Sequence, residues 1–250
     1  MPAPETSGET DFGFERVPLE EKPRLVRRVF DAVASRYDLM NDLMSGGVHR
    51  LWKWEMIRRL NPRAGQLLLD VAGGTGDIAE RFVATAGAAA IVCDVNRAMI
   101  ETGRDRAIDR GRLGEILWLC GDAEALPIAS CSVDAVTIAF GLRNVTRMEA
   151  ALAEMRRVLK PGGRFLCLEF SPVSTPALSW LYDLYSFHVL PRIGAVVTGD
   201  GAAYQYLVES IRRFPDQQEL ARRMEAAGFE QVTVRSLSGG IAGLHSGWRL

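Results

Sequence analysis

From Gln66 onward, short apolar runs alternate with stretches in which apolar residues recur at helical spacing. The helical stretches cover residues 77–87, 97–111 and 146–163, the last of which ends at Pro161-Gly162-Gly163. The apolar runs, which we predict to be strands, cover residues 66–72, 89–95, 115–122, 133–140 and 164–170. Nearly continuous apolar strands that alternate with amphipathic helices indicate a parallel sheet covered by helices on both faces.

The end of the chain departs from this alternation. A helix predicted at residues 214–229 is followed by two strand-like runs, 231–237 and 241–248, which only residues 238–240 separate. Two strands linked this tightly can pair only as antiparallel neighbours. We therefore predict an α/β fold: a three-layer, Rossmann-like sandwich with a mostly parallel seven-stranded sheet and a C-terminal antiparallel hairpin. This architecture resembles a class I methyltransferase more than a symmetric dinucleotide-binding fold.

The segments outside the sheet suggest a cover for a binding site. Residues 1–16 lack the apolar segment of a secretory signal and are expected to form a disordered tail. We expect a helical extension at 17–60, and a lid insertion around 172–213 within the sheet domain, residues 61–250. Both segments are rich in large apolar side chains. Such residues more often belong to the core, but their excess here favours a shared lid over the active site: Met40, Met44, Trp52, Trp54, Met56, Trp180, Leu181, Leu184, Tyr185, Phe187 and Leu190.

Composition excludes several classes of function. The formal net charge of -1 gives no general attraction to nucleic acid. The most apolar late stretch, residues 176–197, is interrupted by charged residues and proline and lacks the uncharged run of a spanning helix. Neither the four cysteines nor the three histidines have the spacing of metal ligands, so no metal site is expected.

A glycine-rich turn joins the first strand of the sheet to the following helix. Gly74-Thr75-Gly76-Asp77-Ile78-Ala79 matches the G-x-G-x-x-A dinucleotide fingerprint, although such a turn can also be purely structural. Asp94 ends the second strand, where a carboxylate can accept hydrogen bonds from both ribose hydroxyls of NAD or of S-adenosylmethionine. Asp122 and Ala123 follow the third strand and could read the amino edge of adenine, although Asp122 could equally be a solvated loop residue.

Two carboxylates near the turn discriminate between these ligands. NAD would place its diphosphate at the helix N-terminus, where Asp70 and Asp77 would oppose it. S-adenosylmethionine carries an ammonium and a sulfonium and has no phosphate. We therefore favour the methyl donor, with the alternative that Asp77 merely caps its helix.

Several longer stretches resemble a known family, the ubiquinone/menaquinone-biosynthesis C-methyltransferases of the UbiE type. The resemblance covers nearly everything from residue 17 to the C-terminus, and its N-terminal YDLMND…HRLWK and C-terminal YQYLVESIRRFP blocks are the most specific. The matching stretches are residues 30–53, 67–79, 141–145, 157–171, 204–220 and 237–248.

The resemblance implies which residues bind the donor and which act on the acceptor. The donor positions are Thr75 between Gly74 and Gly76, Asp94, and Asp122 with Ala123. A family serine that also contacts the donor is replaced here by Ala139, so a side-chain bond from this position is lost. Arg143, Asn144 and Tyr37 are implied to serve the chemistry. We expect Arg143 to lower the pKa of a quinol, Asn144 to orient a water that takes the proton, and Tyr37 to bound the ring or hydrogen-bond an oxygen. The alternatives are an ordinary surface salt bridge for Arg143 and a packed aromatic for Tyr37.

The implied reaction is methylation of a ring carbon in a polyprenylated quinol, either 2-methoxy-6-polyprenyl-1,4-benzoquinol, demethylmenaquinol or both. S-adenosylmethionine supplies the methyl group, and no metal is required. A cytoplasmic enzyme peripheral to the inner membrane is expected, and a homodimer or contact with quinone-biosynthesis enzymes is compatible with it. The alternatives are a methyltransferase acting on another lipid such as a phospholipid amine, an NAD-dependent oxidoreductase, and a non-catalytic scaffold that binds the donor.

Overall fold

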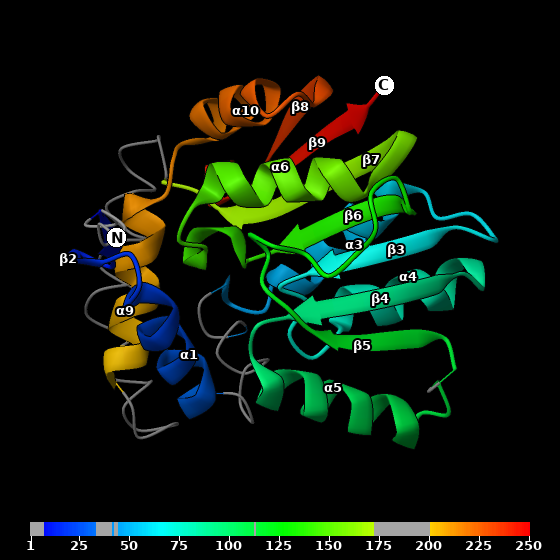
Figure 1. The fold of residues 1–250 in the computed structure, drawn as a ribbon, viewed down its shortest axis with the longest axis horizontal. Helices are drawn as coiled ribbons and strands as arrows, with labels where there is room; N and C mark the ends of the chain where they lie inside the picture. The colour runs from blue at the N-terminus through cyan, green and yellow to red at the C-terminus, as the bar shows by residue number, and fades with distance from the viewer. Residues whose placement is uncertain (1–7, 34–41, 43–44, 113, 173–200) are drawn as a thin grey trace, which may run out of the picture.

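The structure, a computed structural model, describes residues 8–33, 42, 45–112, 114–172 and 201–250. Its seven-stranded sheet confirms the predicted fold class, with the strand order β5-β4-β3-β6-β7-β9-β8 (Figure 1). Six strands are parallel to one another, and only β9 runs antiparallel to its neighbours β7 and β8. The strands are β3 (Leu67–Val71), β4 (Ala89–Asp94), β5 (Ile116–Cys120), β6 (Val133–Ala139), β7 (Leu159–Phe170), β8 (Glu230–Leu237) and β9 (Ala242–Arg249).

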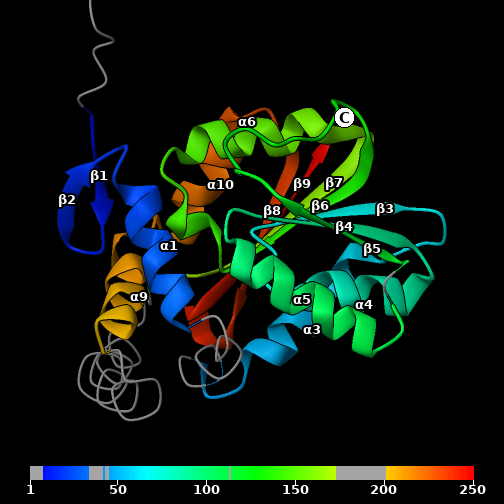
Figure 2. The same cartoon turned by 60° about the horizontal axis from the view of Figure 1, so that its bottom comes forward.

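Helices cover both faces of this sheet, as the apolar strands require. The first face carries α3 (His49–Leu60), α4 (Asp77–Ala86) and α5 (Arg97–Asp109), and the second carries α6 (Met148–Val158) and α10 (Gln217–Ala226) (Figure 1, Figure 2). The core is accordingly divided into two buried clusters. Leu68 of β3 belongs to the cluster that includes Phe82, whereas Leu69 belongs to the cluster that includes Met155, because successive side chains of a strand point to opposite faces.

The boundary between α6 and β7 differs from the sequence prediction. The helical pattern extends to residue 163, but α6 ends at Val158 and the chain becomes extended at Leu159. Leu159 pairs with Val133, and the register then shifts before Arg164 pairs with Ala135. Pro161 explains the early end of the helix, since the residue before a proline is disfavoured in helical conformation. The Lys160–Gly163 segment is therefore part of an irregular strand.

The helix α3 belongs to the sheet domain and not to a separate extension. Trp52, Met56 and Leu60 are buried in the cluster on the first face, and the indole nitrogen of Trp52 donates to Ser238 Oγ at 2.9 Å. Trp52 and Met56 are thus core residues, while Trp54 is 57% exposed. The other apolar residues predicted to form the lid, including Met40, Met44 and Trp180, lie outside the described residues.

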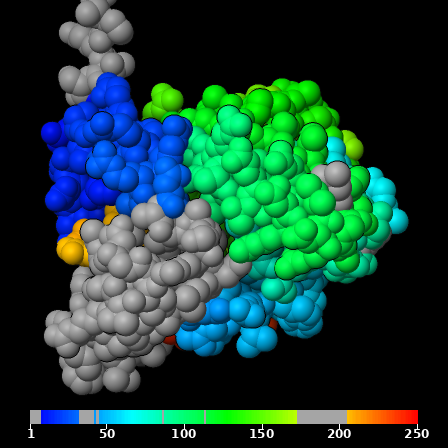
Figure 3. Space-filling view, turned by 90° about the horizontal axis from the view of Figure 1, so that it is seen from below, coloured from blue at the N-terminus to red at the C-terminus, as the bar shows by residue number. Residues whose placement is uncertain are grey.

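The N-terminal residues cover the carboxyl edge of the parallel strands. The sequence predicts a disordered tail up to residue 16, but β1 (Glu9–Phe12) and β2 (Glu15–Pro18) form an antiparallel hairpin. The hairpin packs on α9 (Gly201–Arg213), and α1 (Lys22–Val33) follows it along the same edge (Figure 1). Figure 3 shows these N-terminal residues in blue as a lobe against the green body of the sheet domain. Contact with α9, which is distant in sequence, accounts for the order that the tail's own composition does not predict.

None of the described helices combines the length and the apolar character that crossing a membrane requires.

Candidate functional site

Strained backbone marks one place on the carboxyl edge of the sheet. Ala72 follows β3 with φ of 49°, and Phe140 follows the neighbouring β6 with φ of 60°. Non-glycine residues adopt this left-handed conformation at a cost and concentrate at functional sites. The strand order also reverses between β3 and β6, which is where open α/β sheets bind their ligands. Both observations place the candidate site at the same edge.

Two adjoining cavities form a cleft at this edge. One is lined by Gly74, Asp94 and Asn96, and the other by Asp122 and Ala123. They share residues from four separate segments, namely Val26, Ala72, Val95, Gly141 and Asn144. The fold thus brings Gly74, Asp94, Asp122 and Ala123 to one cleft beside α1, whereas the predicted donor residue Thr75 lines a different cavity.

Asp94 holds the glycine-rich turn in place. Its two carboxylate oxygens accept the backbone N–H groups of Gly74, at 2.9 Å, and Asn96, at 2.8 Å. Burial raises the pKa of this carboxyl, and the two backbone hydrogen bonds oppose the increase. Each oxygen has a second lone pair, so Asp94 can accept ribose hydroxyls while it keeps these bonds. The predicted role in ribose binding is compatible with this geometry.

A smaller cavity on the other side of the turn contains groups of opposite charge. Lys53, Asp70 and Thr75 line it together with Gly73 and Ala139. Asp70 Oδ1 accepts the Thr137 hydroxyl at 2.8 Å, but the buried Asp70 Oδ2 has no hydrogen-bond partner among the described residues. Burial raises the pKa of Asp70 to about 7. The cavity therefore contains a carboxylate oxygen without a hydrogen-bond partner and a lysine. The carboxylate suits the ammonium group of an amino acid, and the lysine suits its carboxylate.

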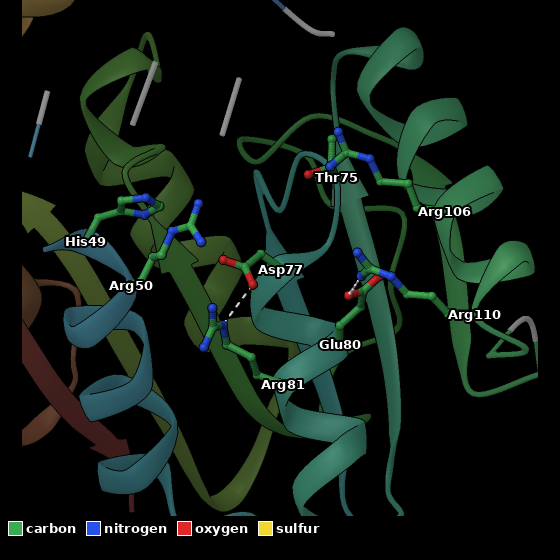
Figure 4. Close-up of a pocket in the computed structure, with 8 residues that line it drawn as sticks. All are labelled: His49, Arg50, Thr75, Asp77, Glu80, Arg81, Arg106 and Arg110. Carbon is green, nitrogen blue, oxygen red and sulfur yellow. Dashed lines mark hydrogen bonds and ion pairs between the residues drawn. The ribbon is translucent and has the colours of Figure 1, made fainter. Parts of the chain in front are cut away.

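The charge of Asp77 is compensated, which weakens the electrostatic argument drawn from the sequence. Lys53 Nζ and Arg81 Nε each donate to the Asp77 carboxylate at 2.8 Å. Burial raises the pKa of this carboxyl, but the two cations together hold it below its usual value. Figure 4 shows Asp77 between His49 and Arg50 on one side and Glu80 and Arg110 on the other. Of the two carboxylates near the turn, Asp77 is therefore paired with cations. The two carboxylates would repel a diphosphate less than the sequence suggests.

Gly76 occupies a space that a larger residue could share only if the ring of Trp118 moved. Its φ is 81°, and a Cβ placed on it would lie 2.5 Å from the ring of Trp118 in β5. The same ring lies 2.4 Å from a Cβ built on Gly103 of α5. The two glycines thus let α4 and α5 approach Trp118, which sets the position of the turn relative to β5.

Arg143 has a different environment from the one expected. Its guanidinium donates to Glu169 Oε1 at 2.5 Å and to the carbonyl oxygen of Phe140 at 2.6 Å. Both charged side chains are 1% exposed, and burial raises the pKa of Glu169 although Arg143 opposes the increase. Arg143 is absent from the lining of the donor cleft and contributes to a separate cavity with Lys22 and Tyr206. Its geometry indicates that it secures the strained turn after β6.

Asn144, the other member of the pair, does reach the cleft. It lines both cavities that contain the donor-binding residues. Its Oδ1 accepts the hydroxyl of Tyr206 at 3.0 Å. Asn144 ends the short helix η2 (Leu142–Asn144), whose first turn is fixed by Arg143. Tyr37, the third residue expected to serve the chemistry, lies outside the described residues.

Sequence reasoning missed three residues that complete the site: Lys53, Glu169 and Tyr206. Lys53 and Tyr206 belong to the two most specific blocks of the family resemblance, and Glu169 lies in a third matching stretch. Polar residues within otherwise apolar patterns were the available signal, since Lys53 is next to buried Trp52 and Glu169 is inside a strand. These three residues bond to Asp77, Arg143 and Asn144, which are 24, 26 and 62 residues away in sequence. No local sequence pattern therefore identifies the three missed residues.

Comparisons with known proteins identify the family of this chain. A relative from Acidiphilium cryptum, named ubiquinone/menaquinone biosynthesis C-methyltransferase UbiE, is 57% identical over 98% of this chain and 99% of its own length. A relative of the same name from Rhodopseudomonas palustris is 58% identical over 96% and 97%. A SAM-dependent methyltransferase from Aquifex aeolicus has the same fold, with a TM-score of 0.59 at 16% identity over 79% of this chain and 89% of that one. Residues 17–249 match the family model itself. The chain therefore belongs to the ubiE/COQ5 methyltransferase family.

Proposed function

We propose that this protein transfers a methyl group from S-adenosylmethionine to a ring carbon of a polyprenylated quinol in ubiquinone or menaquinone biosynthesis. The observation that supports this most strongly is the end-to-end similarity to relatives that carry this function in their name. The acceptor would be 2-methoxy-6-polyprenyl-1,4-benzoquinol, demethylmenaquinol or both. The similarity to the Aquifex structure, at 16% identity, supports the fold alone.

The residues around the glycine-rich turn fit the donor. Asp94 would accept the ribose hydroxyls, and Asp122 with Ala123 would meet the adenine. The unpartnered Asp70 Oδ2 would accept the ammonium of the methionine part, while Lys53 and Thr75 face the same small cavity and could meet its carboxylate. NAD has no amino-acid end to fill this cavity, which favours the methyl donor over the dinucleotide.

The acceptor must become nucleophilic at carbon. A quinol hydroxyl gives its proton to a water molecule, and the charge on oxygen spreads to the ortho carbon. That carbon attacks the sulfonium methyl group, and S-adenosylhomocysteine leaves with its sulfur as a neutral thioether. Water takes the ring proton, which restores the aromatic ring as a phenolate, and the phenolate oxygen then takes a proton back from water. The protein's task is to position the ring and to stabilise the negative oxygen.

The surroundings of the two side chains support Asn144 over Arg143 as the residue that would provide this stabilisation. Glu169 neutralises the Arg143 guanidinium, and Arg143 does not line the donor cleft. Asn144 lines the cleft, and a side-chain amide nitrogen can donate a hydrogen bond to the quinol oxygen. We therefore propose that Arg143 positions the turn and that Asn144 contacts the acceptor, with Tyr37 retained as a residue that bounds the ring.

The tail of such an acceptor stays within a membrane. The proposed reaction consequently takes place where the protein meets the membrane surface from the cytoplasmic side. A homodimer and contact with other quinone-biosynthesis enzymes belong to the same proposal.

The test is turnover with S-adenosylmethionine carrying an isotopically labelled methyl group. Purified protein is incubated with a short-tailed benzoquinol, with a short-tailed naphthoquinol and, as a control for the rival lipid methyltransferase, with phosphatidylethanolamine vesicles. We expect mass spectrometry to find the label on a ring carbon of at least one quinol and none on the phospholipid. Labelling of the phosphatidylethanolamine amine alone would contradict this proposal and favour the phospholipid methyltransferase. Labelling of no acceptor would support a non-catalytic scaffold that binds the donor.

A further inference from the structure

We propose that Tyr206 is a positioning residue that fixes the orientation of the Asn144 amide, and that the N-terminal hairpin holds Tyr206 in place. This inference rests on the proposed function, since it concerns the amide that would contact the quinol. It gives a role to α9 and to residues 9–18, neither of which contributes a predicted site residue.

The hydrogen bond between the two side chains is buried on the side of Tyr206. The phenol donates to Asn144 Oδ1 at 3.0 Å, and Tyr206 is only 4% exposed. Burial raises the pKa of the phenol well above its usual value, so it remains protonated and able to donate throughout the physiological range. Because the phenol donates to Oδ1, the hydrogen bond fixes which end of the Asn144 amide, oxygen or nitrogen, is next to Tyr206.

This orientation decides which end of the Asn144 amide is available to a ligand in the cleft. Its Nδ2 has no hydrogen-bond partner among the described residues, and Asn144 lines both cavities of the donor cleft. Tyr206 lines neither cavity; it lines the separate one that also contains Arg143. The hydrogen bond therefore connects one side of the turn to the other, and it leaves the donor end of the amide for a ligand.

The orientation matters because the two ends of an amide have opposite effects on a developing phenolate. An N–H group donates to the negative oxygen and lowers the pKa of the quinol, whereas a carbonyl oxygen would repel it. Without the Tyr206 hydroxyl the amide could turn over, since its two ends are nearly the same size. Tyr206 thus acts through Asn144 and need not touch the acceptor.

The hairpin contacts α9 at two neighbouring residues, Tyr206 itself and Glu209. The rings of Phe12 and Tyr206 stack with centroids 4.2 Å apart and an interplanar angle of 21°. Close by, the backbone N–H of Phe14 donates to Glu209 Oε2 at 3.1 Å, one turn of α9 beyond Tyr206. The ring of Phe14 itself lies over Arg213 and is 48% exposed. Phe12 and Phe14 therefore form a matched pair within one hairpin.

The main test is Tyr206→Phe, which keeps the ring stacked on Phe12 and removes only the hydroxyl. We expect kcat to fall about tenfold, as the loss of one hydrogen bond implies, with no change in the affinity for S-adenosylhomocysteine measured by calorimetry. The acidic limb of the kcat–pH profile should move to higher pH, because the bound quinol ionises less readily. A merely structural contribution would lower stability or donor affinity without moving this limb.

A double-mutant cycle identifies Asn144 as the intermediary. In an Asn144→Ala background, Tyr206→Phe should have no further effect on kcat. An equal loss in both backgrounds would overturn the proposal, as would an unmoved pH profile.

The hairpin is tested with the matched pair. We expect Phe12→Ala to reduce kcat about threefold and Phe14→Ala to leave it unchanged. Equal losses in the two variants would remove the hairpin from the proposal.

A spectroscopic measurement separates this inference from the proposed function. In ¹⁵N-labelled protein without any acceptor, Tyr206→Phe should shift the side-chain amide resonances of Asn144, while Phe14→Ala should not. If the wild-type protein methylates no quinol but the resonances shift as expected, the proposed function fails and the contact stands. Unshifted resonances would overturn the inference whatever the acceptor.

Discussion

Arg143 shows how burial changes what a single residue can do. An arginine after the fourth strand of a methyltransferase sheet suggests a charge directed at the acceptor. In the folded chain its charge is paired with Glu169, and one of its nitrogens donates to the carbonyl oxygen of the strained Phe140. Removing one member of such a buried pair leaves an uncompensated charge. Loss of activity in Arg143 variants would therefore reflect the turn as much as the chemistry.

Asp70 provides a pH-dependent prediction at the same scale. Burial raises its pKa to about 7, and the donor's ammonium would favour the ionised form. The protein must therefore release a proton from Asp70 when it binds the donor below pH 7. We expect the affinity for S-adenosylhomocysteine to increase about tenfold from pH 6 to pH 8, following the ionised fraction of this carboxyl.

The control is Asp70→Asn, which keeps a hydrogen-bond acceptor without a charge. Calorimetry across the same range should show weaker and nearly pH-independent binding. An equally steep dependence in the variant would assign the titration to another group.

At the scale of elements, the turn between β3 and α4 depends on helices and strands that lie on either side of it. The glycine motif locates the turn in the sequence, but Trp118 in β5 decides how closely α4 can approach. The two ends of α4 differ in this respect. Gly76 at its start has φ of 81°, and a Cβ there would clash with Trp118. Gly87 at its end has φ of 57°, and a Cβ there would have no atom within 4 Å.

Alanine substitutions at the two ends of α4 should separate strain from contact. We expect Gly87→Ala to lower the free energy of unfolding by about 1 kcal/mol, from the left-handed backbone alone. Gly76→Ala should lower it by about 2–4 kcal/mol and also weaken donor binding, because overpacking adds to the strain. Urea denaturation and calorimetry measure the two effects. Adding Trp118→Leu should recover part of the loss, and equal losses for the two glycines would exclude the contact with Trp118.

At the scale of the whole molecule, the site exists only when the sheet is assembled. Residues of α1, the glycine-rich turn, the ends of β4 and β5, and η2 meet in one cleft. Its two central strands, β3 and β6, are adjacent because the chain crosses back between β5 and β6. Ligand binding must therefore stabilise the entire domain and not one loop.

This linkage predicts a selective thermal shift. A ligand that binds only the folded state stabilises it by about 2.7 kcal/mol at a hundredfold excess over its Kd. For a chain of this size, S-adenosylhomocysteine at that excess should raise Tm by roughly 5–10 °C. NAD at the same concentration should leave Tm unchanged. The opposite pattern would exclude the methyl donor and support an oxidoreductase.

The sequence alone determined the elements that depend on local pattern. Apolar runs gave the strands to within one or two residues except at β7, the SerGlyGly link gave the antiparallel end, and polar residues after strands gave Asp94 and Asp122. Asp94 and Asp122 line adjoining cavities because the carboxyl ends of parallel strands meet at one edge, while their role in donor binding stays a prediction. Only the tertiary structure decided how charges pair. The long-range partners of Asp77, Arg143 and Asn144 are 24, 26 and 62 residues away in sequence, and a side chain's charge depends on which groups and how much water surround it. For the same reason the ordered hairpin at residues 9–18 is visible only once α9 is folded against it.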